Sequence, residues 1–258
     1  MQLFDEMTRE AIREQAPEAL AVLPVGATEQ HGPHLPVGTD RFAVEAIARA
    51  AAQAASDQIP VIVTPTLPFG SSSHHLPFSG TMSLTTETYL RVVMDLAESL
   101  ITDGFQRIFI LNGHGGNHEI IQLVARDLAL KYPAHLAAAS YWTIAWEGFL
   151  TVKGETPGRM PGHAGIFETS LVMALRPELI SEPRPHRDLS DEPVTSTFAA
   201  RYRAEHHGSW QEMAGYTDSP DQGTADLGRA YLDAAADAVS QAFIEFYTAS
   251  GGTRAEGS

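Results

Sequence analysis

The chain contains no cysteine, so it has neither disulfides nor thiolate metal ligands. Any metal bound by its side chains must be held by His, Asp or Glu. Basic residues are few, with 17 Lys and Arg against 32 Asp and Glu, and the net charge of -15 argues against a nucleic-acid or anionic-membrane partner. There is no apolar run of membrane-spanning length, no basic leader and no signal-peptide core, so we expect a cytoplasmic protein.

Strand-like and helical patterns alternate along the 258 residues, which suffice for one large domain with a substantial core. The alternation predicts an α/β fold, a single domain with a mostly parallel β-sheet flanked by helices on both faces. We expect this domain over residues 1–248 and a flexible tail over 249–258, while the polar region after Arg187 supports no assignment. The expected strands are 20–25, 61–65, 107–111 and 136–141, and the expected helices are 8–15, 41–55, 85–103, 118–131, 163–174 and 225–248.

Residues 29–40, EQHGPHLPVGTD, form the most informative segment. Glu29 and His31 are two apart, so in an extended segment their side chains point the same way, and Asp40 follows a turn that folds back beside them. The segment follows an expected strand, and open α/β sheets place their sites at the carboxyl ends of strands. Imidazole and carboxylate together suit zinc, manganese or iron. The alternative is an exposed polar loop with histidines by chance.

A second strand-to-helix turn is predicted at residues 112–117, NGHGGN. Its Gly115 and Gly116 allow the backbone to approach a ligand closely, and His114 is expected to project into the same cleft. Asn117 is expected to cap the following helix. A phosphate-binding loop is the alternative, but no Gly-Lys-Ser/Thr continuation follows.

The third segment is residues 163–170, HAGIFETS, in which His163 and Glu168 flank an expected helix start. Glu168 is a candidate metal ligand and His163 a candidate proton carrier. This pair is weak alone, because its spacing is not that of a helical His-x-x-x-His zinc site. In the alternative interpretation Glu168 caps its helix and His163 is a polar surface residue.

Taken together, these segments resemble the creatininase (creatinine amidohydrolase) family. The likeness rests on the order and spacing of Glu-x-His-Gly-x-His-Leu-Pro ending in Thr-Asp, then Asn-Gly-His, then His-x-Gly-x-x-Glu-Thr-Ser. A weaker match is HLPFSGTMSL at residues 75–84, and residues 215–228 are similar to the late Gly-rich segment of the family. The resemblance covers about residues 1–245.

The resemblance implies two divalent metal ions per subunit, zinc, manganese or iron, at the carboxyl ends of the sheet. It implies hydrolysis of a C-N amide bond by a metal-activated water, with His163 and Glu168 as catalytic residues. The ligands that it implies, with Asp40 bridging, are Glu29, His31, Asp40, His114 and Glu168.

This chain departs from the creatinine-cleaving members beside two of the motifs. Those members have an aromatic residue and a metal-binding glutamate where Gly115 and Gly116 stand here, so Glu168 is expected to take over the second metal. They carry a Trp-Asp pair and a Glu where this chain reads RMPG at residues 159–162, so the tryptophan lid over creatinine is expected to be absent.

Further substrate-binding residues are expected around the cleft. Trp142 is the candidate for a remaining aromatic wall, and His75 for a residue that lines the cleft. Arg159 can bind a substrate carboxylate bidentately, although a solvated side chain is the alternative. Gly115 and Gly116 complete this set.

A small cyclic or linear amide, similar to creatinine, is the first expectation for the substrate. Within the family, the alternatives are a peptidase that matures a mycofactocin-type precursor peptide and a formamide hydrolase. A non-catalytic metal-binding subunit is the alternative from another class, and it would be expected to have lost a ligand. The resemblance also implies a homo-oligomer, with a hexamer as the expected form.

Overall fold

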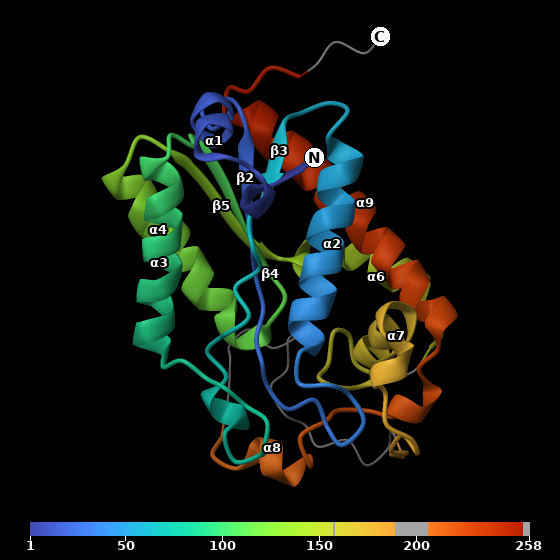
Figure 1. Ribbon diagram of the computed structural model, residues 1–258. Coiled ribbons are helices and arrows are strands. Elements are labelled where there is room, and N and C mark those ends of the chain that lie inside the picture. The colour runs from blue at the N-terminus through green and yellow to red at the C-terminus, as the bar shows by residue number, and fades with distance from the viewer. Residues whose placement is uncertain (157, 189–205, 255–258) are drawn as a thin grey trace.

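The computed structural model describes residues 1–156, 158–188 and 206–254 (Figure 1). Within them, five strands form one sheet in the order β1-β3-β2-β4-β5, and every neighbouring pair is parallel. The predicted α/β class, with a parallel sheet between helices, is confirmed. The strands are β1 (Gln2–Leu3), β2 (Leu20–Val25), β3 (Val61–Val63), β4 (Arg107–Asn112) and β5 (His135–Ser140).

The two central strands, β2 and β4, are buried along their whole length. Strands covered on both faces have no solvent side, and this explains their nearly continuous apolar sequences. Their register pairs Leu20 with Arg107 and Val25 with Asn112, so both strands end at the same level. The chain moves from β2 to β3 on one side and then crosses to β4 on the other. The loops after β2 and β4 therefore open at a topological switch point, where such sheets bind ligands.

Helices cover both faces of the sheet (Figure 1). Two hydrophobic clusters of buried residues lie on the two sides of the sheet. The helices that contribute to the first are α2 (Thr39–Ala55), α5 (Tyr141–Ile144), α6 (Trp146–Lys153), α7 (Ile166–Leu175) and α9 (Ala225–Ala249). The helices on the other side are α1 (Arg9–Gln15), α3 (Thr86–Thr102) and α4 (His118–Lys131).

The loop after β2 lies close to the start of α2. A Cβ atom at Gly26 would lie 3.0 Å from the Cα atom of Arg41, so glycine permits this approach. Helix α2 begins at Thr39, two residues earlier than expected, and Asp40 therefore lies in its first turn. The helix holds the Asp40 carboxylate beside the carboxyl end of the sheet.

Several elements differ from the expected ones. The structure adds the short strand β1 and the helices α5 and α6, which the sequence pattern did not predict. The region after Arg187 for which no assignment was made lies mostly outside the described residues, as do residues 255–258 of the expected tail. The domain boundary at residue 248 stays a prediction.

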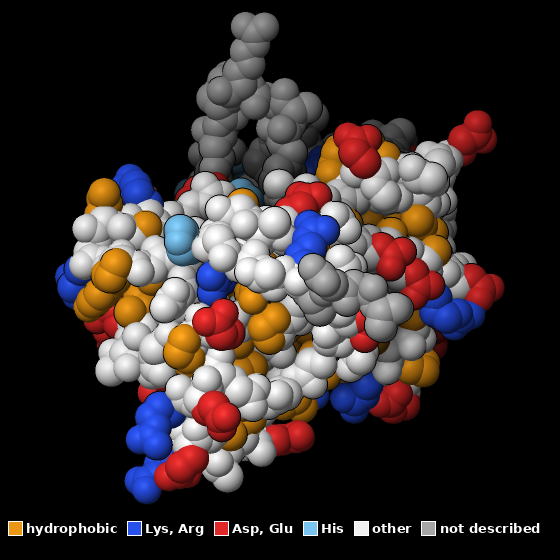
Figure 2. Space-filling model, turned by 90° about the horizontal axis from the view of Figure 1, so that it is seen from above, with side chains coloured by type: hydrophobic (Ala, Val, Ile, Leu, Met, Phe, Trp, Pro, Cys, Tyr) orange, Lys and Arg blue, Asp and Glu red, His pale blue; other side chains and the backbone are white. Residues whose placement is uncertain are grey.

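The surface is charged with both signs. Figure 2 shows acidic and basic side chains interspersed over the face seen from above. Among the helices that the structure describes, none is long and apolar enough to span a membrane.

Candidate metal centre

All five predicted metal ligands meet at the carboxyl ends of β2 and β4. Glu29 and His31 come from the loop after β2, Asp40 from the first turn of α2, His114 from the loop after β4, and Glu168 from the first turn of α7. Each is buried, with exposed fractions between 0% for Glu29 and 8% for Glu168. The interpretation of residues 29–40 as an exposed loop is therefore wrong.

Asp40 lies between two groups of ligands. Its Oδ1 is 3.1 Å from His31 Nε2, and its Oδ2 is 3.1 Å from His114 Nδ1. Glu29 Oε1 lies 3.2 Å from His114 Nδ1. We call the group formed by Glu29, His114 and Asp40 Oδ2 the Glu29 side of the centre. Glu168 Oε2 lies 3.6 Å from His31 Nε2, and these two with Asp40 Oδ1 form the Glu168 side.

Backbone carbonyls orient the two histidines. His114 Nε2 lies 3.2 Å from the Ser71 carbonyl, and His31 Nδ1 lies 3.1 Å from the Glu29 carbonyl. A carbonyl only accepts hydrogen bonds, so these nitrogens carry the protons. The other nitrogen of each ring faces the carboxylates and would offer a lone pair to a metal ion once its proton has left.

The donor set fits divalent cations. Both carboxylate oxygens of Glu29 and Oδ2 of Asp40 are buried and accept no hydrogen bond. Buried polar atoms in that condition are rare, and a bound cation would satisfy them. Among the described residues, three groups of three place one ligand atom from each residue within 4.8 Å of the others: Glu29 with His74 and His114, Glu29 with His31 and His163, and His31 with Asp40 and Glu168.

The carboxylates also control protonation of the two ligand histidines. Burial alone lowers the pKa of His31, but Asp40 and Glu168 outweigh it and raise the pKa to about 10. In the same way, Glu29 and Asp40 overcome burial and hold the pKa of His114 well above its usual value. When no cation is bound, protons on these rings therefore balance the negative charge of the carboxylates. A metal ion must displace these protons in order to bind.

The pKa values of the Glu29 and Glu168 carboxylates are shifted in opposite directions. Burial raises the pKa of Glu168 to about 8, against the opposing effect of His31. Burial would also raise the pKa of Glu29, but His114, His75 and His163 keep it well below its usual value. Glu168 Oε2 also accepts a hydrogen bond from the Ala164 N–H. Glu168 therefore bonds to the backbone just before its helix, as the capping interpretation expects, and also lies in the candidate metal centre.

His163 and His75 lie against the Glu29 carboxylate. His163 Nδ1 is 3.7 Å and His75 Nε2 is 3.5 Å from Glu29 Oε1, and the two rings stack with centroids 4.2 Å apart. His163 is 7% exposed, so the interpretation of His163 as a surface residue is wrong. Burial lowers the pKa of both, to about 3 for His75, and both are therefore neutral near pH 7.

Gln30, between the two ligands of the first segment, connects the site to a distant loop. Its Nε2 donates to the carbonyl of Gly215 at 2.9 Å and lies 2.9 Å from His75 Nδ1. His163 Nε2 lies 3.0 Å from both the backbone carbonyl and the side-chain Nε2 of Gln30, so Gln30 holds this edge of the ring and Nδ1 faces Glu29. The sequence analysis missed this role, because only the acids and histidines of the segment were considered as site residues.

The predicted helix cap at Asn117 is wrong. The Asn117 side chain makes no capping hydrogen bond to α4. Its Oδ1 accepts from the Ser71 N–H at 3.0 Å, and its Nδ2 donates to the Gly26 carbonyl at 3.1 Å and to Asn112 Oδ1 at 3.2 Å. The side chain therefore ties together the loops after three strands, and these contacts replace the local one.

The predicted substrate-binding residues are in different surroundings. A Cβ atom at Gly115 would meet nothing within 4 Å, whereas one at Gly116 would lie 2.1 Å from the Ser71 carbonyl oxygen. Trp142 belongs to the apolar core, where its ring contacts Tyr141, and it is 8% exposed. The backbone N–H of Arg159 donates to Asp218 Oδ2. Substrate binding by these residues stays a prediction.

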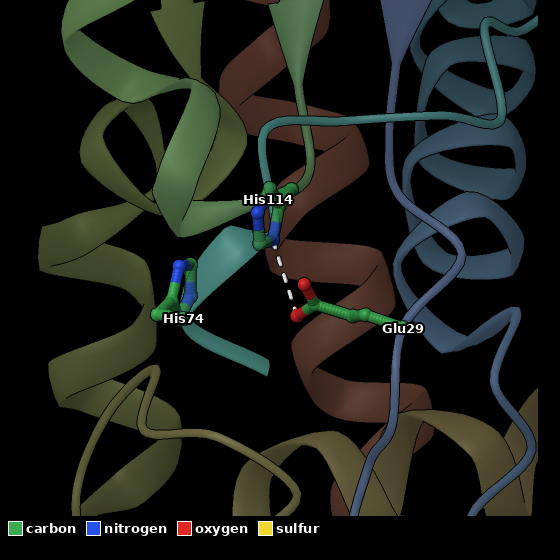
Figure 3. Close-up of side chains that lie close together, drawn as sticks. All are labelled: Glu29, His74 and His114. Atoms are coloured by element: carbon green, nitrogen blue, oxygen red, sulfur yellow. Dashed lines mark ion pairs between the residues drawn. The ribbon is translucent and has the colours of Figure 1, made fainter. Parts of the chain in front are cut away.

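Two further residues lie near the site, of which the sequence indicated only one. Trp210 of α8 (Ser209–Glu212) has its ring centroid 4.5 Å from that of His75 and 5.1 Å from that of His163. It lies outside the motifs, so no sequence signal marked it. His74 joins Glu29 and His114 in one of the three ligand groups (Figure 3). The sequence predicted that His74, like His75, lines the cleft, but not that it is a ligand.

Fold and site define a class, that of parallel α/β proteins with a buried histidine and carboxylate centre at the switch point of the sheet. The family model described as creatininase, creatinine amidohydrolase, matches residues 5–243, and the chain belongs to this family. The creatinine amidohydrolase of Pseudomonas putida is 31% identical over 194 residues, which cover 67% of this chain and 70% of that protein. A mycofactocin precursor peptide peptidase of Mycobacterium tuberculosis (strain CDC 1551 / Oshkosh) is 33% identical over 60% of this chain and 58% of its own length.

Solved structures agree with this assignment. A structure described as "Creatininase Mn" superposes with a TM-score of 0.77 and 25% identity, covering 94% of this chain and 97% of the other. A mutant creatininase described as Zn-Zn type superposes with a TM-score of 0.74 and the same identity and coverage. The alignments with mycobacterial peptidases span only about 60% of those proteins, so activity, substrate and partners are matters for proposal.

Proposed function

We propose that the protein is a divalent-metal-dependent amidohydrolase that cleaves the C-N bond of a small cyclic or linear amide, other than an ordinary peptide bond. The observation that supports this most directly is the position of Asp40, with one oxygen 3.1 Å from His31 and the other 3.1 Å from His114. Such a carboxylate can bridge two cations. Zinc, manganese or iron held here would polarise a substrate carbonyl and make water more acidic.

His163 is the proposed proton carrier. Burial, with His31 and His75 close by, lowers the pKa of His163, so the ring is neutral and able to accept a proton near pH 7. Its Nδ1 faces the Glu29 carboxylate and its Nε2 is held by the Gln30 carbonyl. In the proposed reaction His163 accepts the proton of the attacking water and donates it to the leaving nitrogen, with Glu168 as its catalytic partner.

Creatinine is the first substrate to test, because the chain shares the family and 31% identity with a creatinine amidohydrolase. The experiment measures creatine formation by protein reconstituted with Mn²⁺ and Zn²⁺, with bound metal quantified in the same sample. Turnover would establish creatinine hydrolysis. Bound metal without turnover would direct the search to other amides, and absence of bound metal would contradict the metal-dependent mechanism.

The substitution Asp40→Asn tests the bridging role. We expect metal affinity to fall about 100-fold or more, and activity with it, because one neutral amide replaces the carboxylate shared by both sides. Asp57→Asn, at an exposed position, is the matched control and should retain both properties. Retained metal and activity in Asp40→Asn would exclude this assignment.

A peptidase acting on a mycofactocin-type precursor peptide is the second candidate, supported by the relatives that bear this name at 29% to 33% identity. Mass spectrometry of such a peptide after incubation with metal-loaded protein would show the shortened product. A formamide hydrolase is a further candidate, because it would use the same metal-dependent cleavage of a C-N amide bond. A non-catalytic subunit is disfavoured, because the five predicted ligands are all present and together.

We further propose that the protein acts as a homo-oligomer in the cytoplasm, with no nucleic-acid or membrane partner. The hexamer implied by the family resemblance predicts six times the chain mass of 27.9 kDa in light scattering. A monomeric mass would contradict it.

A further inference from the structure

His74 lies at the edge of the metal centre. It belongs to the short 3-10 segment Ser73–His75, in the loop that connects β3 to α3. One of its ring nitrogens is within 4.8 Å of ligand atoms of both Glu29 and His114. Figure 3 shows its ring beside that of His114, with the Glu29 carboxylate next to both. None of the roles proposed so far uses this residue.

The ring of His74 is held parallel to that of His114. Their centroids are 5.8 Å apart and their planes differ by 3°. Gly116 leaves room for this arrangement, because a Cβ atom there would lie 2.6 Å from His114 Nε2 and 3.1 Å from His74 Cε1. The His74 ring also contacts His75, with centroids 4.2 Å apart, and Trp210, with centroids 5.7 Å apart.

We propose that His74 is a further protein ligand of the divalent cation held on the Glu29 side. The inference rests on the proposed function, since it requires a cation at this centre. Ligand atoms that share one zinc ion through bonds of about 2.0 to 2.2 Å lie no more than about 4.4 Å apart, and the ligand atoms of Glu29, His74 and His114 all lie within 4.8 Å of one another, so at most a small side-chain rotation would bring them onto one ion. Two imidazoles with carboxylate oxygens form a donor set typical of zinc.

With His74, the two sides differ in the number of protein ligands. The Glu29 side has four, from Glu29, His74, His114 and Asp40, which is the number in closed tetrahedral sites. The Glu168 side has three, from His31, Asp40 and Glu168, which is the number in sites that keep a position for water or substrate. We therefore expect the cation on the Glu29 side to bind more tightly and to serve mainly as an anchor.

The experiment compares Co²⁺ binding to metal-free wild-type protein and to His74→Phe. Phenylalanine keeps an aromatic ring against His75 and Trp210 and removes both nitrogens. We expect the affinity for one of the two ions to fall at least about tenfold, the loss that disturbed metal sites commonly show. The visible absorption of bound Co²⁺ should change as well, because the number of ligands changes. His74→Gln provides a second variant if His74→Phe does not fold.

Two comparisons separate the outcomes. His135→Phe, at the opposite end of the sheet and exposed, should match wild type. Unchanged affinity and absorption in His74→Phe, with normal binding by wild type, would overturn this inference alone and leave His74 as a packing residue. A wild-type protein that binds no Co²⁺ would overturn the proposed function together with it.

Discussion

Gly116 has no room for a side chain, whereas the adjacent Gly115 does. A Cβ atom at Gly116 would lie 2.1 Å from the Ser71 carbonyl oxygen, which is the acceptor that orients His114. We expect Gly116→Ala to destabilise the protein by about 1 to 3 kcal/mol and to weaken metal binding, because Ser71 or His114 must shift. Gly115→Ala, which meets nothing within 4 Å, is the control. Urea denaturation and metal titration of both variants test this, and equal behaviour would contradict it.

His163 is the residue for which a catalytic role and a ligand role make different predictions. In the proposed reaction it carries protons, so His163→Gln should lower kcat by about 10² to 10⁴ and leave both metal ions bound. The assay uses the amide found by the creatinine experiment, with metal content measured on the same preparation. His163 also lies in one ligand group with Glu29 and His31. Loss of one ion in the variant would therefore assign His163 as a ligand instead.

At the residue scale, the sequence predicted the ligand types but missed residues that depend on tertiary contacts. Glu29, His31 and His114 stand in motifs of distinctive spacing, and the structure brings them together. Trp210 reaches His75 from a helix distant in the chain, which no local pattern reports. Asn117 resembles a helix cap in sequence, yet the three loops around it use its side chain.

At the scale of elements, the start of α7 depends on Asp218. This fully buried carboxylate accepts the N–H of Ile166, the first residue of α7, at 2.6 Å, and the N–H of Arg159 at 2.8 Å. Helix N-termini leave such donors without partners inside the helix. Asp218 therefore fixes the loop and helix start that position His163 and Glu168.

We expect Asp218→Ala to lower the free energy of unfolding by about 2 to 3 kcal/mol, because one buried and one partly buried N–H group lose a charged acceptor. Metal affinity should fall with it, since Glu168 lies in the first turn of the same helix. Urea denaturation measures the first effect and metal titration the second. Asp237→Ala, on the exposed face of α9, should change neither. A stable Asp218→Ala variant with normal metal binding would show that Asp218 does not position this helix.

The longer elements could be predicted from the sequence, and the short ones could not. Strand β2 (Leu20–Val25) and helix α4 (His118–Lys131) match the expected ranges, since apolar runs and helical periodicity extend over enough residues to be read. Strand β1 has two residues and α5 has four. Such pieces carry too little periodicity of their own, and tertiary pairing and packing determine them.

At the scale of the whole molecule, strand order places the candidate centre. The alternation of strands and helices predicts a parallel sheet but not the order β1-β3-β2-β4-β5, because order depends on which side each crossover takes. That order makes β2 and β4 neighbours, with Val25 beside Asn112. Motifs about 80 residues apart in the chain thus form one buried site with three carboxylates, Glu29, Asp40 and Glu168.

These buried charges predict how the stability of the metal-free protein depends on pH. The folded state raises the pKa of His31 from 6.5 to about 10 and that of Glu168 from 4.5 to about 8, and it raises that of His114 as well. Between pH 7 and pH 9 the folded state therefore binds more protons than the unfolded state. The free energy of unfolding should fall as pH rises through this range.

Two other histidines have lowered pKa values, and these affect stability at lower pH. Burial lowers the pKa of His75 to about 3 and that of His34 to about 4, so their effect is a loss of stability as pH falls below about 6.5. Urea denaturation of chelator-treated protein at pH 7 and pH 9 measures the predicted decline. In protein loaded with Zn²⁺ the decline should be much smaller, because a cation in place of the protons leaves the ligands without a titration in this range. An equal decline with and without metal would contradict the assignment of these groups as ligands.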